Sequence, residues 1–172
     1  MNVNEKSFLV KSVLNIIQHY NHKKYWGMRK EVINPKSKKP KIIRLYYLLL
    51  IKKMDSYNNA SMGTHFGYGA YFATPPRLMH GLNGIIISHK ATIGENCIIY
   101  HQVTIGNSFD EKAATIGDNC FIGAGAKIIG GIHIGNNVKI GANAVVVKDV
   151  PDNCTVVGSP AYIVRMNATK TK

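Results

Sequence analysis

The stretch IGDNCFIGAGAKIIGGIHIGNNVKIGANAVV, at residues 116–146, decides the fold of this 172-residue chain. It divides into hexads that each begin with an aliphatic residue, and most have glycine in the second place. The same period runs through residues 87–105, and the step from 105 to 116 then predicts an interrupting loop near residues 107–114. The aliphatic positions are Ile87, Ile93, Ile99, Ile105, Ile116, Ile122, Ile128, Ile134, Ile140 and Val146.

A strict six-residue repeat is typical of a parallel β-helix. One aliphatic side chain per flat face points inward, and stacked coils bury a continuous column of them. We expect the glycine beside it to let the backbone turn the corner at low steric cost. Cys97, Cys120 and Cys154 each follow an asparagine in the repeat, so we interpret them as small packing residues rather than nucleophiles. Their odd number and spacing indicate neither a disulfide framework nor a zinc knuckle.

The part before the repeat has a helical period instead. Apolar residues three or four apart predict an amphipathic helix over residues 3–20. A polar, proline-bearing stretch at residues 34–40 separates it from an apolar segment at residues 42–54. We expect a second helix there, although its run of consecutive apolar residues also suits a buried strand. The predicted division is a basic helical segment at 1–57, a β-helix domain at 58–165 and a tail at 166–172.

Charge is concentrated in the first of these parts. Residues 1–57 contain 13 Lys or Arg against 3 acidic residues, whereas residues 58–172 contain nine against six. Such a segment can meet nucleic acid, anionic lipid or an acidic glycan, or it can simply be a solvated face. No ordered nucleic-acid motif accompanies it, so we expect no nucleic-acid partner. The hydrophobic fraction of 45% excludes a mostly disordered chain. The longest apolar run, residues 45–51, is too short to cross a bilayer, and no signal peptide is recognisable, which favours a cytoplasmic location.

Several further motifs follow one another in a recognisable order. They are VTIG at 103–106, IGAGAKI at 122–128, GANAVV at 141–146, DVP at 149–151 and GSPA at 158–161. With them the chain resembles the hexapeptide-repeat acyltransferases. It is similar to serine O-acetyltransferases, and closer still to the serine-acetyltransferase-like enzymes of bacterial surface-polysaccharide genes. The resemblance implies a mainly β fold, a left-handed parallel β-helix preceded by a helical segment; the left-handed sense comes from the resemblance alone.

The resemblance also implies a reaction. In this family acetyl-CoA lies in a groove between adjacent subunits of a homotrimer, and a histidine deprotonates the acceptor hydroxyl. The matching histidine is His80. An imidazole titrates near neutral pH and can accept the proton during attack on a thioester. Backbone N–H groups at glycine-rich coil edges can stabilise the oxyanion. The implied acetyl donor is acetyl-CoA, and we expect no metal.

The chain departs from the serine-specific pattern in two places. Serine acetyltransferases pair the histidine with an aspartate, and the matching position is Asn59, whose amide can orient an imidazole but cannot stabilise its charge as a carboxylate does. They also have an Arg-His pair in the interrupting loop, which helps bind the carboxylate of serine. Here that loop contains Asp110 and Glu111, and Ala113 replaces the histidine. These changes suit a neutral, hydroxyl-rich acceptor, with Asn59 and Asp110 as candidate substrate-binding residues.

One histidine and a set of small or basic residues complete the predicted site. His101 stands where family members have a polar group facing the groove, so it is either an acceptor-binding residue, a second proton carrier or a surface residue of the coil. By resemblance, small residues line the pantetheine arm, and Lys148 and Arg165 are candidates for the CoA phosphates. The small residues are Gly123, Ala124, Gly141 and Ala142.

These features predict an acetyl-CoA-dependent O-acetyltransferase that acts on a sugar hydroxyl of a capsular or exopolysaccharide precursor. The alternative within the class is a serine O-acetyltransferase of cysteine biosynthesis. A γ-carbonic-anhydrase-like protein with zinc on His80, His89 and His101, and a non-catalytic scaffold, remain alternatives of other classes. The basic segment, with its lysines between residues 36 and 41, is a candidate for peripheral contact with an anionic membrane surface.

Overall fold

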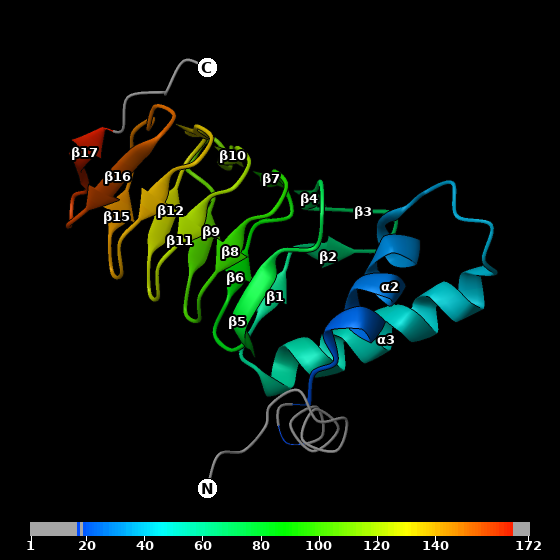
Figure 1. Cartoon of the computed structure of the whole chain (residues 1–172). Coiled ribbons are helices and arrows are strands. Elements are labelled where there is room, and N and C mark those ends of the chain that lie inside the picture. The colour runs from blue at the N-terminus through cyan, green and yellow to red at the C-terminus, as the bar shows by residue number, and fades with distance from the viewer. Residues whose placement is uncertain (1–16, 18, 167–172) are drawn as a thin grey trace, which may run out of the picture.

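The computed structural model describes residue 17 and residues 19–166. Two helices, α2 (His22–Ile33) and α3 (Lys41–Tyr57), precede a long coil of short strands (Figure 1). The apolar segment at 42–54 is therefore helical, and the stretch at 34–40 connects the two helices. The helix predicted over residues 3–20 lies almost wholly outside the described residues.

The coil has three sides, each a sheet of stacked strands. Sheet I has the order β4-β7-β10-β13, sheet II the order β5-β8-β11-β14-β16-β17, and sheet III the order β1-β6-β9-β12-β15. The strand bounds are β1 (Ser61–Met62), β2 (Thr64–His65), β3 (Tyr68–Gly69), β4 (Tyr71–Phe72), β5 (Arg77–Leu82), β6 (Ile86–Ile87), β7 (Thr92–Ile93), β8 (Ile98–Ile99), β9 (Thr104–Gly106), β10 (Thr115–Ile116), β11 (Phe121–Ile122), β12 (Lys127–Ile129), β13 (His133–Ile134), β14 (Lys139–Ile140), β15 (Val145–Val146), β16 (Cys154–Val157) and β17 (Tyr162–Met166).

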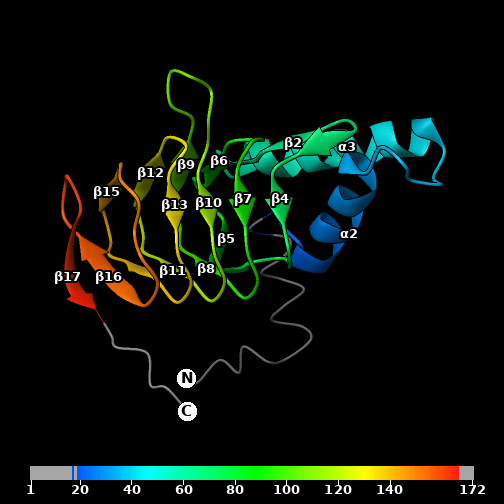
Figure 2. The same cartoon turned by 90° about the horizontal axis from the view of Figure 1, so that it is seen from above.

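Neighbouring strands in the three sheets are parallel, except that β17 turns back antiparallel to β16. The antiparallel hairpin β2–β3 stands apart, beside the helices. Figure 2 shows the strands stacked one behind another, with the loop between β9 and β10 projecting from the stack. The predicted fold class, a mainly β, left-handed parallel β-helix behind a helical segment, is confirmed.

The inward column is the one the repeat predicts. Parallel register places Ile99, Ile122 and Ile140 directly over one another in sheet II. All ten aliphatic positions of the repeat are buried, none with more than 2% of its surface exposed. Each such side chain contributes about 1.5–3 kcal/mol of burial energy, so the column dominates the stability of the coil.

The predicted role of the glycines was wrong. Gly94, Gly117 and Gly123 do not have a positive φ. A Cβ atom on Gly94 would lie 2.7 Å from the carbonyl carbon of Gly117, and one on Gly123 would lie 2.7 Å from the backbone nitrogen of Ala142. These glycines are required because the neighbouring coil approaches too closely for a side chain. Asparagines instead adopt the positive φ that turns the corner between sheets I and II: Asn96, Asn119, Asn137 and Asn153.

The cysteines have the packing role predicted for them. Cys97, Cys120 and Cys154 are free and buried. The thiols of Cys97 and Cys120 each donate to a backbone carbonyl of the next coil, at 3.3 Å and 3.1 Å. They stabilise the stacking of adjacent coils and offer no exposed nucleophile.

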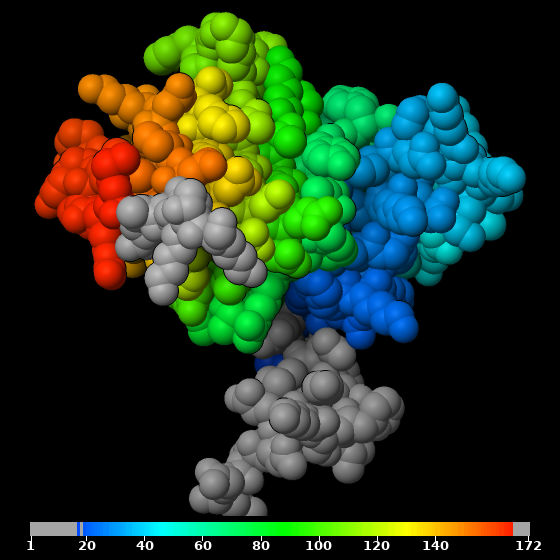
Figure 3. All heavy atoms as spheres, turned by 45° about the horizontal axis from the view of Figure 1, so that its top comes forward, coloured from blue at the N-terminus to red at the C-terminus, as the bar shows by residue number. Residues whose placement is uncertain are grey.

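A buried arginine of α2 connects this helix to the coil. The Arg29 side chain, 2% exposed, donates to the Thr64 hydroxyl at 3.0 Å and to the carbonyl oxygens of Met62 and Ala70 at 3.1 and 2.6 Å. Its guanidinium also lies 4.8 Å from the ring centroid of Phe72. The space-filling view shows the helices closing one end of the molecule and the last strands forming the other (Figure 3). The division at residues 57/58 and 165/166 stays a prediction.

Candidate active site

The corner between sheets II and III, here the II–III corner, brings together most of the predicted site residues. The register of sheet II aligns Leu78 with Ile99, Ile122 and Ile140. The next residues along each coil therefore form a column at this corner. In chain order its members are Met79–His80, Tyr100–His101, Gly123–Ala124 and Gly141–Ala142.

His80 reaches the surface because β5 bends. Burial alternates from Arg77 to Met79 as in a flat strand, but Met79 and His80 are both exposed. Gly81 follows with a φ of 64°, a conformation that other residues rarely adopt. The bend turns the imidazole outward at the corner, where solvent and a bound acceptor can reach it.

His80 lies against His101. Their ring centroids are 4.8 Å apart and the rings are nearly perpendicular. The Tyr100 ring is 5.8 Å from that of His80 and packs in turn on Phe121 at 5.1 Å. The two histidines, 21 positions apart in the sequence, are thus neighbours on successive coils. The aromatic rings of Tyr100 and Phe121 on sheet II lie beside this histidine pair.

His101 has one unsatisfied atom. Its Nδ1 is buried and has no hydrogen-bond partner among the described residues. An unpaired buried polar group costs about 1–3 kcal/mol, so a bound water or substrate group at this atom would be favoured. This geometry supports the prediction that His101 contacts the acceptor or carries a proton, and disfavours a simple surface role.

Asn59 lies near this corner but does not contact His80. The N–H of Gly84 donates to the carbonyl of Asn58 at 2.8 Å, so residues 58–59 occupy the II–III corner one coil earlier. Asn59 is exposed with a φ of 48°. Within the described part of the chain no hydrogen bond joins it to His80, and its role as a substrate-binding or orienting residue stays a prediction.

Asp110 lies at a different corner, between sheets III and I, here the III–I corner. Its loop connects β9 to β10 and projects from the coil (Figure 2). Its carboxylate accepts from the Ser108 hydroxyl and pairs with the Lys112 ammonium at 2.9 Å. Lys112 and Ser108 lower the pKa of Asp110 to about 2, so it is charged at neutral pH. A single protomer therefore keeps Asp110 and His80 apart.

The small residues predicted to line the pantetheine arm, two glycines and two alanines, are small for different structural reasons. A Cβ on Gly123 would meet backbone atoms of the next coil, and one on Gly141 would come within 2.8 Å of a Val157 methyl group. Both glycines are thus required by coil stacking. Ala124 is half-buried and Ala142 is exposed. Each alanine adds only a methyl group to this corner, so neither side chain would block an extended ligand there.

The two predicted phosphate-binding residues come from different elements of the fold. Lys148 lies at the III–I corner and lines a hollow of about 280 Å³ against β17. Arg165 is on β17 itself, paired with Thr155 on sheet II. Both side chains are exposed. They do not form a single cationic site within one protomer.

The zinc alternative requires three histidines that the fold separates. His89 packs against His65 and Tyr68 at the III–I corner, with ring centroids 5.1 and 5.7 Å away. His80 and His101 are at the II–III corner. Across residues 17 and 19–166, no group of three or more His, Cys, Asp or Glu side chains has a metal-binding arrangement. The residues present do not fit a zinc centre.

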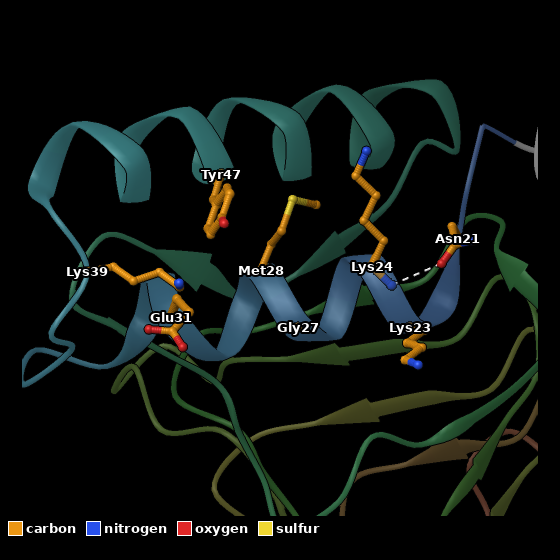
Figure 4. Close-up of a pocket in the computed structure, with 8 residues that line it drawn as sticks. All are labelled: Asn21, Lys23, Lys24, Gly27, Met28, Glu31, Lys39 and Tyr47. Carbon is orange, nitrogen blue, oxygen red and sulfur yellow. Dashed lines mark hydrogen bonds between the residues drawn. The ribbon is translucent and has the colours of Figure 1, made fainter.

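Sequence reasoning missed two hollows near the helices. One, of about 450 Å³, opens beside β5, where the segment before α2 packs against sheet II. A second of similar size lies between α2 and α3, where Lys39 points toward Glu31 and Lys24 points toward α3 (Figure 4). Both depend on how the helices dock, which no local pattern reveals.

Comparison with known proteins shows what the coil is similar to. The family model described as "Bacterial transferase hexapeptide (six repeats)" matches residues 113–148. Among curated relatives, the serine acetyltransferase of Synechococcus elongatus is 40% identical over 105 residues, which is 59% of this chain and 40% of the relative. That of Staphylococcus aureus strain Mu50 is 46% identical over 94 residues, 53% of this chain and 44% of the relative.

Solved structures of serine acetyltransferases superpose on this chain. The serine acetyltransferase of Neisseria gonorrhoeae superposes with a TM-score of 0.63 at 37% identity, over 74% of this chain and 49% of that one. A soybean serine acetyltransferase complexed with serine gives 0.61 at 34%, over 70% and 49%. The chain thus spans about half the length of the relatives it matches, or less. The relatives described here are all named serine acetyltransferase, which matches the alternative prediction and not the polysaccharide enzyme.

Proposed function

We propose that this protein is an acetyl-CoA-dependent O-acetyltransferase. The observation that carries the proposal is the exposed His80, held against His101 at the head of a corner lined by Ala124 and Ala142. Fold alone does not determine function, because many activities share one architecture. The support comes from this site together with relatives named serine acetyltransferase. A serine acetyltransferase complexed with CoA superposes with a TM-score of 0.61 at 30% identity, which supports acetyl-CoA as the donor.

The histidine supplies the step that a neutral hydroxyl cannot make alone. His80 accepts the proton of the acceptor hydroxyl while the oxygen forms its bond to the acetyl carbonyl carbon. Backbone N–H groups at the corner stabilise the negative charge on the carbonyl oxygen. His80 then returns the proton to the sulfur as the C–S bond breaks. No covalent enzyme intermediate is needed for these steps.

The acceptor favoured by the comparisons is L-serine, in place of the sugar preferred from the sequence. A sugar hydroxyl stays the second candidate because of one feature of this chain. The loop at 107–114 pairs Asp110 with Lys112 and has Ala113 where serine enzymes have a histidine. The carboxylate of serine would therefore need a partner elsewhere in the site.

The acceptor is identified by its product. Protein, acetyl-CoA and L-serine, or a panel of free and phosphorylated sugars, are incubated, and O-acetylated products are identified by mass spectrometry. O-acetylserine alone would support the serine proposal, and O-acetylated sugar without O-acetylserine would restore the sugar. Neither product, in a sample shown by calorimetry to bind CoA, would contradict acetyl transfer to these acceptors.

A homotrimer would complete the site. Asp110 and Lys148 are at the III–I corner and His80 at the II–III corner, so one protomer does not bring them together. In a closed ring the III–I corner of one subunit can face the II–III corner of the next, which forms a shared groove. Light scattering tests this directly, since a monomer at assay concentration would remove the shared groove.

The membrane contact also stays a proposal, and α3 gives it a surface. Ile42, Tyr46 and Leu49 recur along one side of the helix and are 77%, 58% and 63% exposed. Lysines follow the same side and the preceding loop, which suits an apolar stripe resting on an anionic lipid surface. No described helix is long and apolar enough to span a membrane.

Vesicle sedimentation tests this contact. Neutralising the loop lysines should abolish binding to vesicles that contain phosphatidylserine, while vesicles of phosphatidylcholine bind neither protein. Two results would contradict the membrane contact: the neutralised variant binds the anionic vesicles as well as the wild type does, or the wild type does not bind them at all. The lysines to be changed are Lys36, Lys38, Lys39 and Lys41.

A further inference from the structure

A pocket beside β5 has walls formed by the sequence neighbours of His80, although neither His80 nor His101 lines it. Its volume is about 450 Å³, and Met79 and Gly81, which flank His80 in the sequence, form part of its wall. The opposite wall comes from the segment that leads into α2. The lining residues are Tyr20, His22, Pro75, Pro76, Arg77, Leu78, Met79 and Gly81.

Among the residues that line the pocket, Arg77 alone carries a permanent charge, and its side chain is exposed. The guanidinium of Arg77 has no hydrogen bond or ion pair with any other described residue. None of the lining residues is acidic, and the sequence contains no Asp or Glu between Asp55 and Glu95. Arginine keeps its charge at all working pH values. The pocket is therefore cationic and uncompensated.

The other polar residues of the pocket are neutral hydrogen-bonding groups. The Tyr20 hydroxyl and Nδ1 of His22 lie 2.8 Å apart. Burial lowers the pKa of His22 and raises that of Tyr20, so both are uncharged at neutral pH. Neither cancels the charge of Arg77, and because they are hydrogen-bonded to each other the pair has one N–H or O–H left to donate to an oxygen atom of a ligand. The first turn of α2, which begins at His22, contains no acidic residue either.

We propose that this pocket binds the anionic group of the acceptor, with Arg77 as its anion-binding residue. The inference rests on the proposed function, because it assumes that the acceptor hydroxyl reaches His80. Arg77 and His80 are three residues apart on β5, about 10 Å between their Cα atoms at the usual rise. The flexible arginine side chain can extend along the strand toward His80, which shortens the distance that the acceptor must span. A guanidinium binds carboxylate and phosphate in the same two-pronged geometry.

Arg77 would supply the carboxylate partner that this chain lacks in the loop, where Ala113 replaces the histidine of serine enzymes. The loop at 107–114 contains Asp110 and Glu111, which pair with Lys112 and Lys90, so it offers no unpaired cation to a carboxylate. Arg77 offers a carboxylate partner on the opposite side of the site, within one strand of His80. An anionic acceptor, either an amino acid or a phosphorylated sugar, thus fits the pocket better than a neutral sugar does.

The test compares acceptors that differ only in the anionic group. CoA release is measured with L-serine against serinol, which lacks the carboxylate, and with N-acetylglucosamine 1-phosphate against N-acetylglucosamine. The wild type should prefer the anionic member of one pair by at least tenfold in kcat/KM. Arg77→Ala should remove that preference mainly through KM, and Arg77→Lys should restore part of it. Lys139→Ala, an exposed residue of the same sheet, is the control and should keep the preference.

A binding measurement separates failure of this inference from failure of the proposed function. Titration calorimetry with L-serine and with inorganic phosphate needs no turnover. Binding that Arg77→Ala abolishes supports the pocket, even if no acceptor is acetylated. Equal binding, or equal acceptor preference, in wild type and Arg77→Ala overturns it, even if acetylation is rapid. Circular dichroism confirms folding, and Arg77→Gln replaces Arg77→Ala if the latter does not fold.

Discussion

A buried carboxyl group under the helices makes stability depend on pH in an unusual direction. Asp55 is 3% exposed, its Oδ1 accepts from the Tyr25 hydroxyl at 2.7 Å, and its Oδ2 has no partner among the described residues. Burial raises the pKa of Asp55 from 3.8 to about 6, even though the Tyr25 hydrogen bond, Lys52 and Arg29 oppose the shift. The folded state therefore holds the proton more tightly than the unfolded chain does.

The sign of the effect follows from this difference. The stabilisation is fully present below the unfolded pKa of 3.8 and is lost as pH rises through the folded pKa of about 6. A shift of roughly two pKa units corresponds to about 3 kcal/mol at most. Other carboxylates, such as Asp110 with its lowered pKa, lose stabilisation at low pH and mask the effect in the wild type alone.

The difference between wild type and Asp55→Asn isolates this contribution. The amide keeps the size of the carboxyl and an oxygen for Tyr25, but it does not titrate. Urea unfolding at several pH values between 4 and 7.5 should show the wild type losing about 2–3 kcal/mol relative to Asp55→Asn as pH rises. A free-energy difference that stays constant with pH would refute the reasoning.

Four further outcomes follow from the packing and the loop. Gly123→Ala should lower the free energy of unfolding by about 1–3 kcal/mol, because its Cβ would meet backbone atoms of the next coil; Gly27→Ala, with open space around it in α2, should raise it by up to about 1 kcal/mol in the same denaturation assay. Ile122→Ala should cost about 2–5 kcal/mol by calorimetry, since it opens a cavity in the fully buried column. Asp110→Asn should lower the melting temperature at neutral pH only slightly, because its ion pair with Lys112 is exposed, and should alter acceptor KM; an unchanged KM would remove Asp110 from the acceptor site.

The coil was predictable because its information is local and periodic. Each hexad places one aliphatic residue inward, so position in the repeat determines burial. The role of Gly123 was not predictable, because it depends on the backbone of the next coil. Helix α2 was missed because polar and aromatic residues such as Tyr25 and Arg29 form its buried side in place of an aliphatic period.

The site was predictable to the extent that register alone determines it. The neighbourhood of His80 and His101 follows from stacking successive coils, and the alanines of the II–III corner continue that column. The pocket around Arg77 depends on the docking of Tyr20 and His22, which lie far away in the sequence. Asp110 and His80 are separated because they occupy different corners of the coil. The sequence repeat does not show which corner a given residue occupies.

The most direct test of the account is CoA release by wild type and His80→Ala, with the acceptor that mass spectrometry identifies. The control is His133→Ala, an exposed histidine of sheet I that lies away from the site. We predict that His80→Ala lowers kcat about 100-fold or more while CoA binding is unchanged, and that the control retains full turnover. Wild-type turnover in His80→Ala would contradict the assignment of His80 as the general base.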